Sequence, residues 1–272
     1  MEHLQKSEIK ILLIVEGENT EYKFFHRITE VFGINAETFP VSTNLYSLYQ
    51  KMKEYQFECD VKDVLRELVP LESEKNMLRQ KFAYTYLIFD SDLQNKTPSQ
   101  RGKATDISNL THENFSKLIE MTAYFTDETD PSIGRLYINY PMMESYRYSD
   151  KFFDESFLTA QIDIDKMAKF KSLANQKKLA GRQIERYEKQ DFSALIRMNV
   201  LKLSVLSGES ADFALPYNKY LDESQQKLIA TKQQKLAQQS KVISVVNTSL
   251  FVLLDYYGNR DSFYDRLMDS QS

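Results

Sequence analysis

The sequence predicts an α/β fold in which a mainly parallel sheet is flanked by helices. Two short apolar runs, residues 9–15 and 82–89, each stop at a carboxylate. Apolar runs without helical periodicity are typical of strands buried on both faces of a parallel sheet. Segments with helical spacing separate these runs, and the 7 glycines and 6 prolines are too few for an all-β protein rich in tight turns.

The first predicted unit is a strand, a turn and a helix. The strand ends at Glu16 and Gly17, and the helix is capped by Asn19 or Thr20. Its apolar residues recur at helical spacing: Tyr22, Phe25, Ile28 and Phe32. Glu21 falls in the first turn, where the helix dipole favours a carboxylate, so we expect it close to Glu16.

The remaining elements of residues 1–150 follow from the same periodicities. We expect a short strand at 36–41, an inserted helical region at about 44–80 and a strand at 82–89 that delivers Asp90 and Asp92. A polar loop at 93–106, a helix at 108–123 and a turn at 127–131 follow. A last strand at 134–141 leads into the start of a helix at 142–146. Residues 151–272 carry little strand signal. Their periodic runs predict a mostly helical C-terminal region: 157–170, 192–206, 223–239 and 241–257.

Carboxylates follow both predicted buried strands at the point where each strand ends. Asp90 and Asp92 lie two residues apart, so both can face the same side of the chain. The carboxyl ends of parallel strands form one edge of the sheet, where ligands bind. Glu16 and the two aspartates would repel one another there unless a cation neutralised them. Because carboxylate oxygens suit Mg²⁺ or Mn²⁺, the sequence predicts a divalent-metal site at this edge.

Composition narrows the class of protein. The formal net charge of −4 gives no overall sign of nucleic-acid binding, so a local basic surface, such as the lysine-rich segment 166–189, would have to provide it. Cys59 is the only cysteine and the three histidines are scattered, which excludes an internal disulfide, a cysteine zinc site and a clustered-histidine mechanism. We expect a cytoplasmic protein, because the N-terminus lacks the apolar core of a signal peptide and no apolar segment is long enough to span a bilayer.

The two acidic motifs resemble those of the Toprim domain, which topoisomerases, primases and the OLD-family and RloB-type nucleases share. The motifs are VEGENTE from residue 15 and FDSD from residue 89, and the resemblance covers roughly residues 8–150. The first motif is closer to RloB-like and OLD-like proteins than to primases. The segment NYPMMES from residue 139 is similar to the Asn-Pro-x-Phe-Glu segment of RloB-like proteins, although here Tyr140 separates Asn139 from Pro141.

This resemblance implies a Toprim-like, Rossmann-like fold and a metal-dependent nuclease, that is, a phosphodiester hydrolase. In the family, a glutamate ends the first strand and has an acid/base or metal-binding role, and the Asp-x-Asp pair holds a divalent metal. The implied catalytic residues are Glu16, Asp90 and Asp92. The implied ligands of one or two Mg²⁺ or Mn²⁺ ions are Glu16, Glu21, Asp90, Asp92 and Glu144.

The resemblance also implies a biological setting. Stand-alone Toprim nucleases of this kind act in bacterial anti-phage defence and abortive infection, often beside an ATPase, as in the PARIS pair. This chain has no Gly-x-x-x-x-Gly-Lys-Ser/Thr loop, so any ATPase would be a separate partner protein. The implied substrate is nucleic acid, either DNA or RNA, with tRNA among the candidates. A homo-oligomer remains open, and no membrane association is expected.

Two other classes of protein fit part of the pattern. HAD-like phosphatases also carry Asp-x-Asp after a strand and use the first aspartate, here Asp90, as a nucleophile. That family has no role for the Glu16–Gly17 strand end, and Leu93 and Gln94 depart from its motif. The second alternative is a non-catalytic Toprim-like module that binds an ATPase or serves as a sensor.

Overall fold

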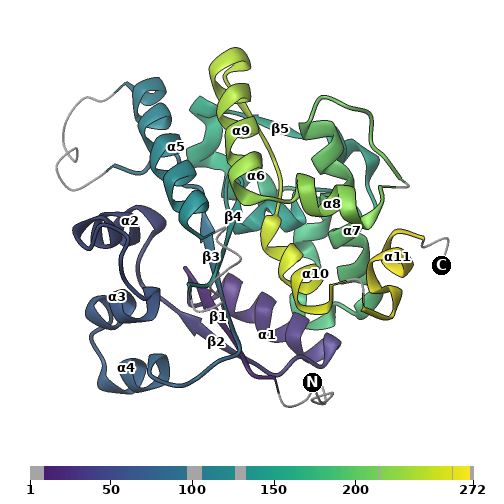
Figure 1. Ribbon diagram of the computed structural model, residues 1–272. Coiled ribbons are helices and arrows are strands. Elements are labelled where there is room, and N and C mark those ends of the chain that lie inside the picture. Colours follow the sequence, from purple (N-terminus) through teal and green to yellow (C-terminus); the bar gives the residue numbers. More distant parts are fainter. Residues whose placement is uncertain (1–8, 97–105, 126–132, 214, 259, 270–272) are drawn as a thin grey trace.

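The structure, a computed structural model, describes residues 9–96, 106–125, 133–213, 215–258 and 260–269 (Figure 1). The predicted turn at 127–131 and most of the predicted loop at 93–106 lie outside the described residues. The strands are β1 (Ile11–Val15), β2 (Ala36–Pro40), β3 (Tyr84–Asp90), β4 (Arg135–Asn139), β5 (Gln161–Asp163) and β6 (Val242–Ser244). The α-helices are α1 (Thr20–Phe32), α2 (Leu45–Glu54), α3 (Val61–Leu68), α4 (Glu72–Leu78), α5 (Ile107–Tyr124), α6 (Phe170–Asn175), α7 (Lys189–Leu206), α8 (Tyr217–Glu223), α9 (Gln226–Ser240), α10 (Val252–Tyr257) and α11 (Phe263–Met268). The 3-10 helices are η3 (Met143–Arg147), η4 (Glu155–Thr159), η5 (Ile164–Lys169), η6 (Lys178–Gly181), η7 (Ile184–Arg186), η8 (Thr248–Phe251) and η9 (Arg260–Ser262).

A four-stranded sheet of order β2-β1-β3-β4 forms the centre of the molecule, and every pair of neighbouring strands in it is parallel. All five residues of β1 are buried, as expected for a strand covered on both faces. The register places Val15 of β1 opposite Ile88 of β3, and Asp90 of β3 opposite Asn139 of β4. The predicted parallel α/β sheet is therefore confirmed.

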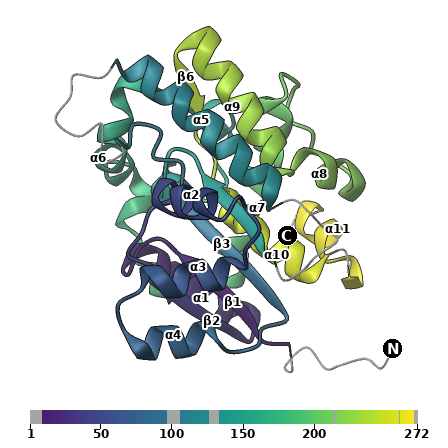
Figure 2. The ribbon, with the colours of Figure 1, turned by 60° about the vertical axis from the view of Figure 1, so that its left-hand side comes forward.

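Helices cover both faces of this sheet. In Figure 1, α2, α3 and α4 lie to the left of the strands and α1 lies to the right. Helix α1 contacts α7, whereas α2 contacts α5, so each face has its own layer of helices (Figure 2). Helices α2 to α4 occupy the region at about 44–80, and that they form an insertion stays a prediction.

The strand order creates a switch point between β1 and β3. The chain leaves β1 for β2 on one side, but it leaves β3 for β4 on the other side. Where the connections of two neighbouring parallel strands diverge in this way, a crevice opens at their carboxyl ends. Glu16 follows β1, and Asp90 is the last residue of β3, so the predicted acidic residues stand at this crevice.

The C-terminal half contains two short strands, β5 and β6, that its helical periodicity does not predict. The periodic run at 157–170 forms η4, β5 and η5 instead of one helix, and the run at 241–257 forms β6, η8 and α10. Tertiary contacts override the helical periodicity here. Strand β5 pairs antiparallel with β6, and the fully buried Lys202 ammonium donates to the carbonyl oxygens of Phe157 (2.5 Å) and Ala160 (2.8 Å) at the end of η4.

The C-terminal half also joins the central sheet directly. The backbones of Tyr140 and Val246 exchange two hydrogen bonds of 2.9 and 3.0 Å, which extends the line of β4. The Thr248 hydroxyl donates to the carbonyl oxygen of Ile138 at 2.8 Å. The apolar core of the described residues runs through both halves as one cluster. The division at residue 150 stays a prediction, but the core is continuous across it.

Asn247 is the buried residue that ties this C-terminal segment to η3, and its loss is expected to destabilise the protein. Its side-chain amide donates to the Met143 carbonyl at 3.0 Å and accepts from the Ser249 hydroxyl at 2.6 Å. Asn247→Ala would leave these buried groups unpaired, so we expect the free energy of unfolding to fall by about 2–3 kcal/mol. Urea unfolding measures the change. The exposed Asn76→Ala is the matched control, and an equal loss in both variants would contradict the prediction.

Candidate metal site at the carboxyl edge of the sheet

The loop after β1 brings two glutamates to the crevice. Glu16 is the first residue beyond the strand, and Glu21 lies in the first turn of α1. The Glu21 carboxylate folds back over Gly17 so closely that a Cβ atom at position 17 would collide with it. A larger residue at position 17 would displace the end of the flexible Glu21 side chain, so glycine permits this close approach.

The end of β3 holds Asp90 and Asp92 in a constrained turn. Asp92 has a φ of 34°, a left-handed conformation that is costly for a residue with a side chain and that clusters at functional sites. Ser91 between them is fully buried and anchors the turn. Its N–H donates to the Asn139 carbonyl at 3.0 Å, its hydroxyl donates to the Pro141 carbonyl at 2.9 Å, and its carbonyl accepts from the Tyr46 hydroxyl. Three hydrogen bonds of Ser91 therefore fix the turn between the two aspartates.

The two strand ends meet directly. The backbone N–H of Asp90 donates to Oε2 of Glu16 at 3.0 Å. Glu16 and the Asp90–Asp92 pair, which are far apart in the sequence, therefore share one edge of the sheet as predicted. Their catalytic role stays a prediction.

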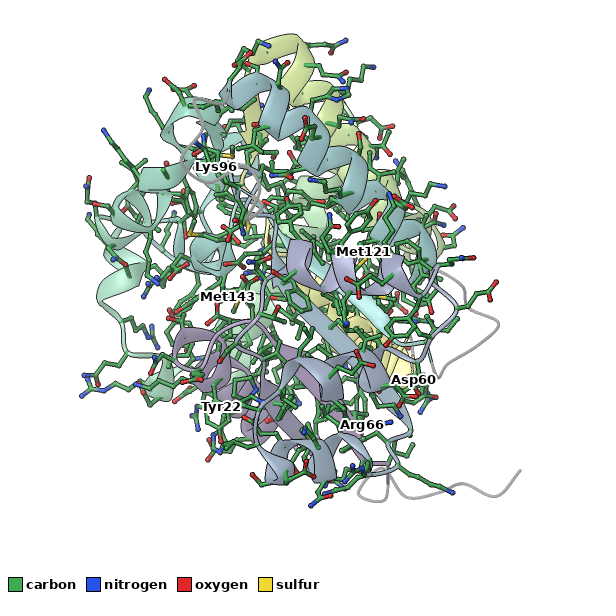
Figure 3. All side chains as sticks on the ribbon, turned by 90° about the vertical axis from the view of Figure 1, so that its left-hand side faces the viewer. Tyr22, Asp60, Arg66, Lys96, Met121 and Met143 are labelled. Atoms are coloured by element: carbon green, nitrogen blue, oxygen red, sulfur yellow. The ribbon has the colours of Figure 1, made fainter. Side chains whose placement is uncertain are left out.

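A fifth carboxylate comes from the segment after β4. The cis peptide bond between Tyr140 and Pro141 leads into η3, which carries Glu144. Glu144 is only 3% exposed. Its Oε1 lies 2.7 Å from Nζ of Lys171 and 3.7 Å from a guanidinium nitrogen of Arg147. In the view of Figure 3, Met143 of the same turn lies between Tyr22 at the start of α1 and Lys96 beyond β3.

Burial and mutual repulsion raise the pKa values of four of these carboxyl groups. For Glu16, burial and then the charge of Asp92 raise the pKa to about 8. Burial also raises the pKa of Asp90 well above its usual value, with the Glu16 charge as the next cause. The pKa values of Asp92 and Glu21 are raised by burial first, and the charge of Glu144 adds to both. The cluster therefore favours any species that brings positive charge, either protons or a cation.

The donor set fits a hard divalent cation in its chemistry. All five side chains offer carboxylate oxygens, which Mg²⁺ and Mn²⁺ prefer. Within the described residues, however, no three Asp, Glu, His or Cys side chains stand close enough together to hold a metal ion. Repulsion separates uncompensated carboxylates, so metal binding would require these side chains to converge.

Two residues that lie at the site, Tyr46 and Lys171, were not predicted from the sequence as site residues. Tyr46, on the inserted helix α2, is buried, and burial and the charge of Asp92 raise its pKa well above the usual value. Lys171 belongs to the basic segment 166–189, which was singled out only as a surface that could contact phosphate. That segment is not one helix face. It spans η5, α6, η6 and η7, and α6 packs against η3 beside the acidic cluster.

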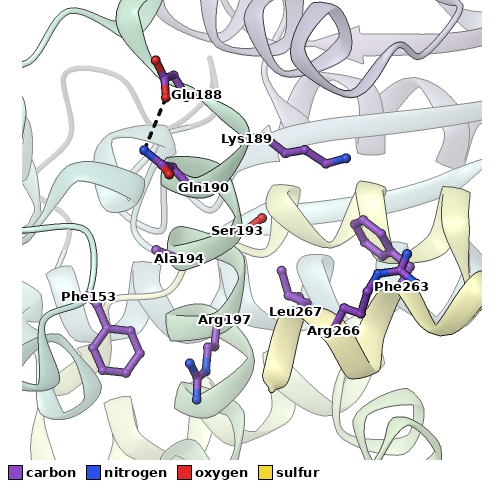
Figure 4. A pocket seen from close by; sticks show the side chains of 10 residues that line it. All are labelled: Phe153, Glu188, Lys189, Gln190, Ser193, Ala194, Arg197, Phe263, Arg266 and Leu267. Carbon is purple, nitrogen blue, oxygen red and sulfur yellow. Dashed lines mark hydrogen bonds between the residues drawn. The ribbon is translucent and has the colours of Figure 1, made fainter. Parts of the chain in front are cut away.

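Two pockets help to delimit the site. A pocket of about 300 Å³ adjoins Asp92 and is lined by Asp92, Leu93, Gln94, Asn95, Pro141, Met142, Met167 and Ala168. A pocket of about 710 Å³ lies along α7 and α11 and includes none of the five carboxylates (Figure 4). Its lining combines apolar side chains with Lys189, Arg197 and Arg266. The smaller pocket, next to the strand ends, is the one that belongs to the candidate site.

Comparison with protein-family models, curated proteins and solved structures gives no match. In the described part of the chain, no helix is both long enough and apolar enough to cross a membrane.

Proposed function

We propose that this protein is a Toprim-like nuclease that hydrolyses nucleic-acid phosphodiesters with the help of Mg²⁺ or Mn²⁺. The observation that carries the proposal is the 3.0 Å hydrogen bond from the Asp90 N–H to the Glu16 carboxylate. It brings the acids of two separate motifs together at a switch point of a parallel sheet, where α/β proteins bind ligands. The raised pKa values of four carboxyl groups support the same conclusion, because such shifts cluster at functional sites.

The surroundings of each residue suit it to a different role in the proposed reaction. When bound, the divalent ion would orient the scissile phosphate, lower the pKa of the attacking water and stabilise the leaving oxygen. Asp90 and Asp92 would hold it, with Glu16, Glu21 and Glu144 as further oxygen donors. Glu16, whose pKa is about 8 without metal, can also accept or return a proton near neutral pH.

A basic surface for the nucleic-acid backbone lies next to these acids. Lys171 and Arg147 stand within 4 Å of Glu144, and α6, which carries Lys171, packs on η3. A chain with a net charge of −4 needs such a local surface to hold a polyanion. The arrangement favours a nuclease over a non-catalytic module, because cationic groups and candidate metal ligands share one edge.

The biological role proposed here is that of an effector in cytoplasmic anti-phage defence that works with a separate ATPase. It follows from the likeness of the two acidic motifs to those of Toprim effectors. Co-expression with any ATPase that a neighbouring gene encodes, followed by size-exclusion chromatography, tests this part. Activity that depends on the partner would separate a restrained nuclease from a free one.

The nuclease proposal predicts cleavage by the purified protein. Plasmid DNA, single-stranded DNA and tRNA would each be incubated with Mg²⁺, with Mn²⁺ or with EDTA, and the products resolved on denaturing gels. We expect cleavage of at least one substrate with metal and none with EDTA. Cleavage that persists in EDTA would overturn the proposed metal dependence. A phospho-aspartate trapped at Asp90 instead of cleavage would overturn the nuclease proposal and would favour the HAD-like alternative.

A further inference from the structure

Glu144 is a buried carboxylate that pairs with two cations, of which Lys171 is the nearer. Its side chain is 4% exposed, and Lys171 Nζ lies 2.7 Å from its Oε1. Arg147 is more distant, at 3.7 Å. An ionised group in such surroundings needs a partner, since an unpaired buried charge is strongly destabilising.

The exposure of the Lys171 side chain allows its ammonium group to move away from Glu144. Its side chain is 62% exposed, so most of the stem lies in solvent and only the ammonium reaches the buried carboxylate. A lysine ammonium is a compact charge on a flexible four-carbon stem, and moving it requires no repacking of the core. Arg147, by contrast, has a side chain that is only 18% exposed and lies one turn along from Glu144 on η3.

Glu144 belongs electrostatically to the strand-end acids. Its negative charge raises the pKa values of both Asp92 and Glu21. The negative charge of Glu21 in turn contributes to raising the pKa of Lys171. A cation placed among these acids would therefore be attracted to Glu144 and would repel Lys171.

We propose that Lys171 is the internal counter-cation of the metal-free site, which gives up Glu144 when a divalent cation binds and then contacts a phosphate of the nucleic acid. This inference rests on the proposed function. Lys171 and the divalent cation compete for one carboxylate, so the lysine ammonium becomes free for substrate only when the site is loaded. Lys171 is thereby both a positioning residue for Glu144 and a substrate-binding residue.

The exchange predicts opposite effects of one substitution on metal affinity and on substrate binding. Lys171→Met removes the competitor, so Mn²⁺, followed by electron paramagnetic resonance, is expected to bind about fivefold more tightly. The same variant is expected to raise the KM for the cleaved substrate about tenfold. It should also lower the magnitude of the slope of log K for substrate binding against log salt concentration by about one, which corresponds to one lost phosphate contact. Lys171→Arg should restore the KM, because it returns the positive charge.

Lys166→Met is the matched control. Lys166 lies on the neighbouring η5 and pairs with Asp163 instead of the acidic cluster, so its loss should leave the Mn²⁺ affinity unchanged. If the methionine variant is poorly folded, the Mn²⁺ measurement is repeated with Lys171→Gln, which keeps a hydrogen-bond donor without the charge. Unchanged or weaker Mn²⁺ binding by the Lys171 variants would overturn the exchange alone. Absence of Mn²⁺ binding by every variant and by the wild type would overturn the proposed metal site itself.

Discussion

Asp90→Asn is expected to eliminate metal-dependent cleavage and to leave the protein folded. The substitution removes a negative charge from the centre of the candidate metal site but keeps the size of the side chain. The backbone N–H of residue 90, which bonds to Glu16 at 3.0 Å, is unaffected. Without metal, the free energy of unfolding of the variant should even be higher than that of the wild type, because burial and the Glu16 charge disfavour the ionised form of Asp90. Gel assays of the substrate cleaved by the wild type would measure the loss.

Glu16→Gln tests the second strand end in the same assay. Its amide oxygen can still accept from the Asp90 N–H, but it provides neither a metal-binding charge nor a proton acceptor. We expect the rate to fall by about a hundredfold or more. Glu18→Gln is the matched control, since Glu18 is exposed in the same loop and accepts only from the Ser42 hydroxyl among the contacts of the described residues. Full activity of either the Asp90 or the Glu16 variant would contradict the metal-site hypothesis.

Without divalent metal, the free energy of unfolding is expected to fall as the pH rises from about 5 to about 8. Glu16 ionises near 4.5 when exposed but near 8 in the folded protein, so in this range the folded state binds more protons than the unfolded state. The stabilising effect of the protonated group is complete below 4.5 and is lost as the pH passes through 8. While this group titrates, the loss approaches about 1.4 kcal/mol per pH unit. The raised pKa values of Asp90, Asp92 and Glu21 act in the same direction.

Mg²⁺ should reverse this trend at the alkaline end. A cation bound by the ionised carboxylates stabilises the folded state by about 2.7 kcal/mol when its concentration is 100 times its Kd. Urea unfolding at pH 5, 6, 7 and 8, with Mg²⁺ and with EDTA, gives both curves. Glu16→Gln should flatten the metal-free curve, whereas Glu18→Gln should not. A metal-free stability that is constant or increasing from pH 5 to pH 8 would show that the cluster does not carry the predicted protons.

The sheet and its acidic edge were accessible from local sequence. The run before the first acidic motif is short and rich in Ile, Leu and Val, which favours a buried strand over a helix, and all five residues of β1 are buried. The expected approach of Glu16 to Asp90 followed from one rule, that parallel strands end at a common edge. The rule required no knowledge of which helices cover the sheet.

The C-terminal half shows where local pattern fails. Its apolar spacing at 157–170 is helical, yet the chain forms β5 because β6, from residues Val242–Ser244, offers a pairing partner. The buried Lys202 ammonium also binds the carbonyl groups that a continuous helix would have paired internally. Both partners are distant in the sequence, so no window of neighbouring residues contains the information.

The sequence by itself determined the parallel sheet, the helices at about 44–80 and the identity of the acids at the strand ends, because helical periodicity, buried strands and the carboxylates that follow them are local features. Only the tertiary structure decided that Glu144 is buried beside the other acids and that Lys171 is its partner. That pairing depends on the packing of α6 against η3, and an ion pair is set by the distance between two charges in space and not by their separation along the chain.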